Sequence, residues 1–202
     1  MKTYILTLAC AGALMTSACS NDSATTTSDS AMDTENSAMN DTSAMDAPAM
    51  NMASDTATAP HATDEEFMKS AAHSDQNEIQ LSKLVLEKGV TGMAKDHANQ
   101  MVTDHTKSTA DLKAIAQKKN VTLPTDMDAA HKAIATTMQN LSGKDLETQY
   151  MQQMVLDHQK TLNTMQAHEK MTQDAELKGF IAKTAPVVQN HLTMFKQHAG
   201  AM

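Results

Sequence analysis

Residues 94–115 read AKDHANQMVTDHTKSTADLKAI, and the assignment of the fold depends on the pattern in this stretch. Its apolar and small residues recur in alternating steps of three and four, which is the spacing of one face of an α-helix. That face consists of Ala94, His97, Met101, His105, Ser108, Leu112 and Ile115. His105 therefore lies in the middle of a seam that faces inward, where an unpaired ionisable group is costly to bury.

Three further segments show the same spacing, and each has one ligand-capable residue in the middle of its apolar seam. The first seam consists of Phe67, Ala71, Ser74, Glu78, Leu81 and Val85. The third consists of Met151, Met154, His158, Thr161, Met165 and His168. The last consists of Leu177, Phe180, Thr184, Val187, His191, Met194 and His198. The central residues are thus Glu78, His158 and His191. Together with His105 they provide one carboxylate and three imidazoles, one group from each long segment.

Capping residues and glycines mark the ends of these helices. Thr63-Asp64-Glu65-Glu66 has the sequence of a capping box, and Gly89 and Asn120 are typical of helix ends. The expected helices begin after Thr63, Thr91, Thr125, Ser142 and near Asp174, and end near Gly89, Lys119, Gly143, Met171 and His198. No segment between them has the pattern of a strand. The sequence predicts an all-α, antiparallel four-helix bundle with one short connector helix.

The four central residues are predicted to lie at similar heights. Counted from the nearer turn at ~1.5 Å per residue, Glu78 and His105 differ by about 3 Å, and His158 and His191 by about 6 Å. Pro186 precedes His191 by five residues and is expected to alter the level of that helix. We interpret the four residues as a transition-metal site. The alternative is a metal-free module whose buried His and Glu residues pair with one another and only fix the packing.

Several other residues are weaker candidates as metal ligands. Met101 and Met154 each precede a seam histidine by one turn, a position explained most simply by core packing but also suited to copper. His97 and His198 lie nearer the ends of the bundle and are weaker candidates. His73, His131 and His168 are expected at the surface or rim. Two aspartates, Asp104 and Asp157, face about 100° away from the seam histidines and are expected to orient ligands on neighbouring helices.

The donor set limits the chemistry of the site. Carboxylate-bridged di-iron bundles use two Glu-x-x-His pairs and two further glutamates, and only one Glu points inward here. Three imidazoles and one carboxylate suit zinc, copper, iron or nickel. Nothing in the sequence resembles a nucleophile–base pair, so an enzyme is the third and least favoured interpretation, and a redox role would first require a bound metal. All 16 basic residues are Lys and the net charge is −8, which argues against nucleic-acid binding.

The first 18 residues have the layout of a signal peptide. Lys2 precedes an apolar run over residues 4–15 that is too short to span a bilayer comfortably, and small residues lead into Cys19. This arrangement resembles a bacterial lipobox, in which the cysteine becomes a lipid-modified N-terminus. Ser20 after the cysteine predicts an outer-membrane lipoprotein facing the periplasm. Ordinary secretion, with Cys19 unmodified, is the alternative.

Residues 19–62 are predicted to be a disordered tether. They are rich in Ser, Thr, Ala, Asp and Met, and have too few large apolar residues to offset the entropy of ordering. Residues 19–60 contain seven acidic residues and no Lys, whereas residues 61–202 contain 17 acidic residues and 15 Lys. The tether is therefore expected to be solvated and self-repelling. Its repeated Ser-Ala-Met units also suggest a weaker alternative, the capture of Cu(I) by thioethers.

Several short stretches resemble the bacterial envelope family known as domain of unknown function 4142, over about residues 64–198. They are Glu65-Glu66-Phe67 with Ala71-Ala72, Asn77-Glu78-Ile79-Gln80-Leu81, Met101-Val102-Thr103-Asp104-His105-Thr106, Tyr150-Met151 with His158, and Ala185-Pro186 with His191-Leu192. His97 departs from the aromatic or aliphatic residue usual in that family. The resemblance implies a ferritin-like bundle over residues 63–199 in an exported protein. It implies no activity, so a metal-binding lipoprotein and a structural or stress-related module both remain open.

Overall fold

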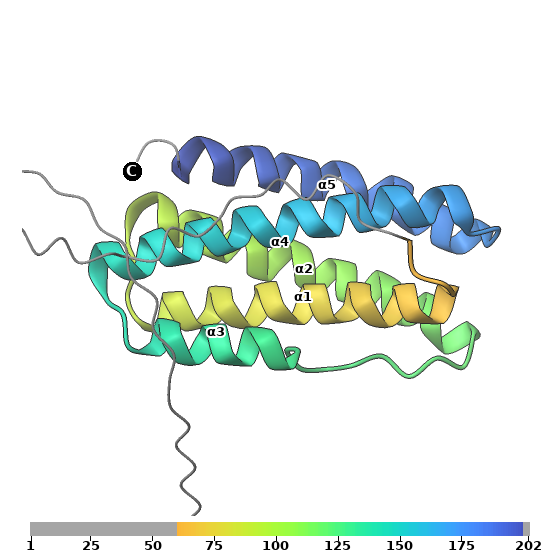
Figure 1. The fold of residues 1–202 in the computed structure, drawn as a ribbon, viewed down its shortest axis with the longest axis horizontal. Helices are drawn as coiled ribbons and strands as arrows, with labels where there is room; N and C mark the ends of the chain where they lie inside the picture. Colours follow the sequence, from red (N-terminus) through yellow and green to blue (C-terminus); the bar gives the residue numbers. More distant parts are fainter. Residues whose placement is uncertain (1–59, 200–202) are drawn as a thin grey trace, which may run out of the picture. The chain divides into compact units, whose positions relative to one another are not determined.

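The computed structural model describes residues 60–199, and over that range it contains five α-helices and no strand. The helices are α1 (Asp64–Glu87), α2 (Gly92–Lys118), α3 (Ala129–Gln139), α4 (Gly143–Met171) and α5 (Ala175–Ala199). The four long helices lie side by side, and the short α3 lies along the outside of α1 (Figure 1). Helix α1 runs antiparallel to α2, and α4 runs antiparallel to α5. Helices α2 and α4 run in the same direction, because the loop after α2 and helix α3 carry the chain back along the assembly before α4 begins. The predicted antiparallel order is therefore wrong for α2 and α4. The all-α prediction is confirmed for this range. The predicted signal peptide, Cys19 and the tether up to residue 59 lie outside the described residues.

The helix ends follow from local chemistry. The Thr63 hydroxyl accepts a hydrogen bond from the Glu66 backbone N–H, and the Glu66 carboxylate accepts one from the Thr63 N–H, so the predicted capping box is confirmed. After α1, Gly89 has a φ of 81°, a left-handed conformation that suits glycine, and the Val90 N–H donates back to the Val85 carbonyl. Asn120 ends α2 in the same way, with a φ of 55°.

The short helix α3 begins later than predicted. Asp128, rather than Thr125, is its N-cap, because the Asp128 carboxylate accepts a hydrogen bond of 2.8 Å from the His131 backbone N–H. Asn77 of α1 fixes this cap from the other side: its amide donates to the Asp128 carboxylate and its carbonyl oxygen accepts from the Asp128 N–H. This contact with α1 sets the start of α3, and it is a tertiary contact that local sequence does not reveal.

Packing is closest within two pairs of helices. Helix α1 packs along α2 and α4 packs along α5, whereas contacts between α1 and α4 and between α2 and α5 are fewer. The core between them is fully buried and consists largely of aliphatic and Met side chains, among them Leu81, Met101, Leu112 and Met154. Within residues 60–199, none of the helices combines the length and the apolarity required to cross a bilayer.

Two predictions about burial were wrong. Val187 was predicted to face inward but is 38 % exposed, and Val188 is the buried residue of that turn. His168 was expected at the surface or rim but is fully buried: its ring stacks on Phe67 at 4.2 Å between centroids, and its Nε2 bonds to Asp64 at 2.9 Å. The stacked aromatic ring and the Asp64 carboxylate at the start of α1 explain how this imidazole is accommodated in the core.

The two threonine N-caps provide a matched test of the helix ends. Thr63 makes a side-chain cap hydrogen bond and Thr91 makes none. Replacing Thr63 with Ala should lower the free energy of unfolding by about 1 kcal/mol, because the Glu66 N–H loses its partner. Thr91→Ala should have a much smaller effect. Urea denaturation followed by circular dichroism measures both, and equal losses for the two variants would contradict the assignment of the capping box.

Candidate metal centre

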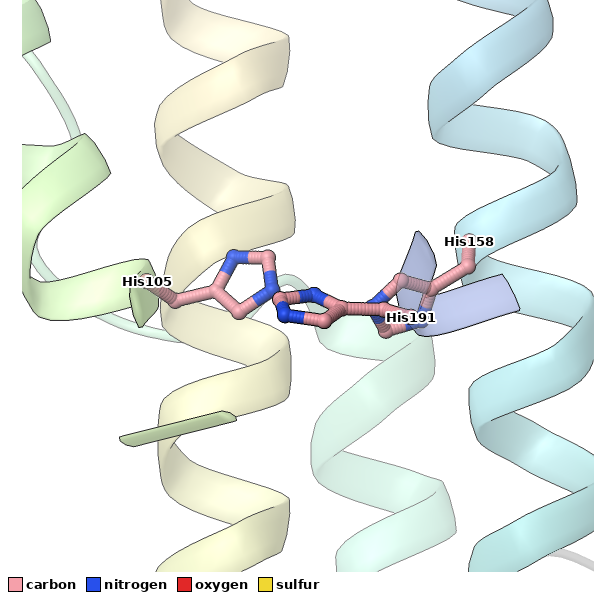
Figure 2. A group of neighbouring side chains, drawn as sticks. All are labelled: His105, His158 and His191. Atoms are coloured by element: carbon pink, nitrogen blue, oxygen red, sulfur yellow. The ribbon is translucent and has the colours of Figure 1, made fainter. Parts of the chain in front are cut away.

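Each long helix contributes one buried, ligand-capable side chain to the same point in the core. Glu78 comes from α1, His105 from α2, His158 from α4 and His191 from α5, and all four residues are at least 97 % buried. Figure 2 shows the three imidazole rings pointing toward one another between the helices. The structure therefore brings together all four residues of the principal sequence prediction.

The distances describe a compact cluster. The ring centroids are 5.6 Å apart for His105 and His158, 5.5 Å for His105 and His191, and 5.3 Å for His158 and His191. One nitrogen from each ring lies within 4.8 Å of the other two. Glu78 Oε2 is 2.5 Å from His105 Nε2 and 3.6 Å from His158 Nε2. Four potential ligand groups thus surround one small volume.

The atoms that face this volume lack aligned hydrogen-bond partners. Both carboxylate oxygens of Glu78, Nε2 of His105, Nε2 of His158 and Nδ1 of His191 are buried without one. The short contact between Glu78 and His105 is charge-paired but does not have the geometry of a hydrogen bond. Buried acceptors without donors are strongly destabilising. A positive charge among them, either a proton or a metal ion, is needed to stabilise the cluster.

The opposite nitrogen of every ring is held in place. His105 Nδ1 bonds to Asp75 Oδ1 at 2.9 Å, His158 Nδ1 to the Met154 carbonyl at 2.8 Å, and His191 Nε2 to Asp104 Oδ2 at 2.9 Å. Carbonyl and carboxylate oxygens only accept, so each of these nitrogens donates its proton outward. The lone pair of a neutral ring then points to the centre, which is the arrangement typical of metal-binding histidines.

Charge interactions set different pKa values around the centre. Burial opposes charge on Glu78 and His105, but their attraction outweighs it, lowering the pKa of Glu78 to about 2 and raising that of His105 to about 10. Burial lowers the pKa of His158, and burial together with the charge of His105 lowers the pKa of His191 to about 4. Near pH 7 the metal-free chain therefore keeps His158 and His191 neutral and one proton between His105 and Glu78.

The weaker candidates lie in other surroundings. Met101 and Met154 are fully buried members of the apolar core, as packing residues would be. His97 is only partly buried, and its ring lies 5.3 Å from that of His198 and 5.6 Å from that of Phe195. Burial and the charge of His198 lower the pKa of His97. It belongs to a separate pair of imidazoles.

Sequence reasoning missed one partner and misplaced another. Asp75 is 5 % exposed and binds His105, and it was not among the predicted residues. Its spacing of three from Glu78 was the available signal, because residues i and i+3 lie on the same side of a helix. Asp104 does orient a neighbouring seam histidine, His191. Asp157 does not, since it bonds to His131.

His131 links three helices just outside this centre. Its Nδ1 lies 2.9 Å from Asp128 at the start of α3, and its Nε2 lies 3.1 Å from Asp157 on α4. Burial opposes charge on this ring, but Asp157 and Asp128 outweigh it and raise its pKa to about 9. The Asp128 cap is in turn held by Asn77, the neighbour of Glu78 in α1. The network therefore ties α3 to the two helices that carry Glu78 and His158.

Comparison with known proteins gives one match. The model of a family described as Domain of unknown function (DUF4142) matches residues 47–198, about three quarters of the chain. No curated protein and no solved structure matches the chain.

The network of His131 predicts a pH-dependent stability. Because the folded-state pKa of about 9 exceeds the ordinary 6.5, the stabilisation is complete below about pH 6.5 and is lost as the pH rises through about 9. The free-energy advantage of the wild type over His131→Gln should therefore shrink between about pH 6 and about pH 9.5. Urea denaturation in the presence of a chelator measures this difference. An advantage that stays constant with pH would contradict a charged His131.

Proposed function

This chain belongs to the family described as Domain of unknown function (DUF4142), and from that premise we propose that its helical domain binds one transition-metal ion. The ligands are Glu78 and the three imidazoles of His105, His158 and His191. The observation that carries the proposal is the set of buried, inward-facing nitrogen and oxygen atoms without hydrogen-bond partners. The proposed architecture is a ferritin-like four-helix bundle in which each long helix supplies one ligand.

The size of the cluster supports this assignment. Bonds of about 2.0–2.1 Å from a zinc-like ion to imidazole place tetrahedral nitrogen ligands roughly 3.4 Å apart. The three ring nitrogens already lie within 4.8 Å of one another, and Glu78 lies between two of them. Small rotations of the rings would close the site around an ion. A metal ion would also displace the proton that pairs His105 with Glu78 in the metal-free chain.

The donor set favours a group of metals. Neutral imidazole suits zinc, copper, iron and nickel, and one carboxylate offsets part of the charge of a divalent ion. Asp75, Asp104 and the Met154 carbonyl hold the outer nitrogens, so the rings are oriented before an ion arrives. No thioether is included in the proposed set, because Met101 and Met154 pack in the apolar core.

We further propose where the domain works. The signal-peptide layout of residues 1–18 and the small residues before Cys19 favour an exported lipoprotein anchored in the outer membrane and facing the periplasm. The acidic, Met-rich residues 19–62 would separate the domain from the membrane, and would add a secondary copper-capturing segment if their thioethers bind Cu(I).

A metal-free module is the second candidate, and the 2.5 Å pair of Glu78 and His105 is the observation that favours it. A buried ion pair of this kind can fix helix register without binding anything. The ion pair of Glu78 and His105 does not explain why the inward nitrogens of His158 and His191 are buried without hydrogen-bond partners. An envelope module of this kind would serve a structural or stress-related role.

Metal content separates the two candidates. The full chain, purified without an affinity tag or chelator, should contain about one zinc, copper, iron or nickel ion per helical domain by elemental mass spectrometry. His105→Ala and His158→Ala should each abolish this binding, because each variant leaves only three of the four proposed ligands. His73→Ala is the matched control, since His73 lies on α1 outside the cluster and bonds to the Asp126 carbonyl.

A second variant tests the orientation of the rings. Asp104→Asn should keep the stoichiometry but weaken the affinity by about tenfold or more, because the His191 ring loses its charged partner. Metal that survives both His105→Ala and His158→Ala would be bound by groups other than the four proposed ligands. A folded chain that takes up none of these ions, and whose His105→Ala variant changes only thermal stability, would support the structural module instead.

A further inference from the structure

A small pocket on the surface between α2 and α5 leads to the proposed metal ligands. Its volume is about 90 Å³, and its lining includes His105 and His191. The other residues that line it are Asp104, Lys107, Ser108, Asp111, Lys183, Thr184, Val187 and Val188. A larger pocket of about 220 Å³ lies among α1, α3 and α4, but none of the four proposed ligands lines it. The pocket between α2 and α5 therefore gives the more direct route to the centre.

The packing of the helices explains why this side is open. Helices α2 and α5 share fewer contacts than α1 with α2 or α4 with α5. The side chains at their junction are short, namely Ser108, Thr184 and Val188. On the opposite side, between α1 and α4, Ser74 and Thr161 bond to each other at 2.7 Å and so satisfy their own hydroxyls. The pocket on that side is larger, but the hydroxyls of Ser74 and Thr161 are already paired there, so the two sides of the centre differ in unsatisfied polarity.

Ser108 supplies a hydrogen-bonding group inside the pocket. It is 9 % exposed, and its hydroxyl has no aligned hydrogen-bond partner among residues 60–199. It lies near enough to Asp75 to act on that carboxyl without forming an aligned bond. Because it follows His105 by three residues, it shares the inward face of α2. A hydroxyl without an aligned partner is free to rotate from Asp75 toward the pocket and to donate a hydrogen bond to a ligand there.

The size and charge of the pocket limit what it can hold. A single buried water needs at least roughly 10–15 Å³ of such space, so a ligand of a few atoms fits and a larger metabolite does not. At the rim, Asp104 is engaged by His191 and Asp111 by Lys183, whereas Lys107 has no carboxylate partner within residues 60–199. The two aspartates and two lysines of the rim balance in formal charge, because His191 is neutral near pH 7. The positive charge that favours an anion is that of a divalent ion held by one carboxylate and three neutral imidazoles.

We infer that this pocket is the access path by which a small anion of two or three heavy atoms reaches the bound metal, where it completes the coordination and accepts a hydrogen bond from Ser108. The inference rests on the proposed function, because the anion binds to the ion held by Glu78 and the three histidines. It goes beyond that function by making the centre open to an exogenous ligand rather than closed by its four protein ligands.

Cobalt(II) tests the binding of the metal ion, and azide separately tests the binding of an anion to that ion. Addition of Co²⁺ to the metal-free full chain should produce visible absorption bands, which report occupation of the centre. Azide should then change those bands saturably as it enters the coordination sphere. Ser108→Ala should bind Co²⁺ as the wild type does, but bind azide about three- to tenfold more weakly, the loss expected for one hydrogen bond.

A blocking variant provides the second measurement. Val187→Phe should fill the mouth of the pocket and strongly reduce the response to azide while Co²⁺ uptake persists. Leu156→Phe is its matched control, because Leu156 is a similarly exposed aliphatic residue on α4 that does not line the pocket. This control should respond to azide as the wild type does.

The outcomes distinguish the two proposals. Absence of Co²⁺ bands in the wild type would overturn the proposed function and this inference with it. Normal Co²⁺ bands that azide leaves unchanged would overturn only the inference and indicate a centre closed by its protein ligands. Equal azide affinity in the wild type, Ser108→Ala and Val187→Phe would also overturn it, because the anion would then reach the ion by another path.

Discussion

The carboxylate of Glu78 is fully buried, and neither of its oxygens receives an aligned hydrogen bond from any residue of the described chain. An isolated carboxylate in an apolar interior is very costly, so some positive charge must accompany it. His105, His158 and His191 surround it, one from each of the other long helices. The packing of all four helices must therefore satisfy this one group, and their relative heights are constrained by it.

Hydrogen bonds from the surrounding structure fix the orientation of the three imidazole rings. Two carboxylates and one backbone carbonyl hold the outer nitrogens of the rings, and they come from α1, α2 and α4. Their effect is to fix the tautomers and turn the lone pairs inward. Beyond them, His131 ties α3 to α1 and α4 through Asp128 and Asp157. The helix outside the main assembly thus stabilises the two helices that present Glu78 and His158.

Much of this arrangement was predictable because helix periodicity and caps are local properties. The capping box at Thr63 and the turn at Gly89 set the bounds of α1, and steps of three and four residues identified all four central side chains. Counting residues left a mismatch of about 6 Å between His158 and His191 at ~1.5 Å per residue. The rings nevertheless lie 5.3 Å apart, and α5 continues through Pro186. Counting residues could not predict the contacts between helices. These are the hydrogen bond of Asp75 with His105, the stacking of His168 on Phe67, and the hydrogen bond of Asn77 with Asp128.

The central claim is that a metal ion occupies the middle of this cluster with nitrogen and oxygen ligands. X-ray absorption spectroscopy at the edge of the ion found in the purified chain tests it most directly. An ion held in this cluster should show three imidazole ligands and one or two oxygen ligands at about 2.0–2.2 Å, with no sulfur. A sulfur shell near about 2.3 Å, or a sphere of oxygen alone without imidazole scattering, would contradict it, because the ion would then be held by the methionines or bound loosely at the surface.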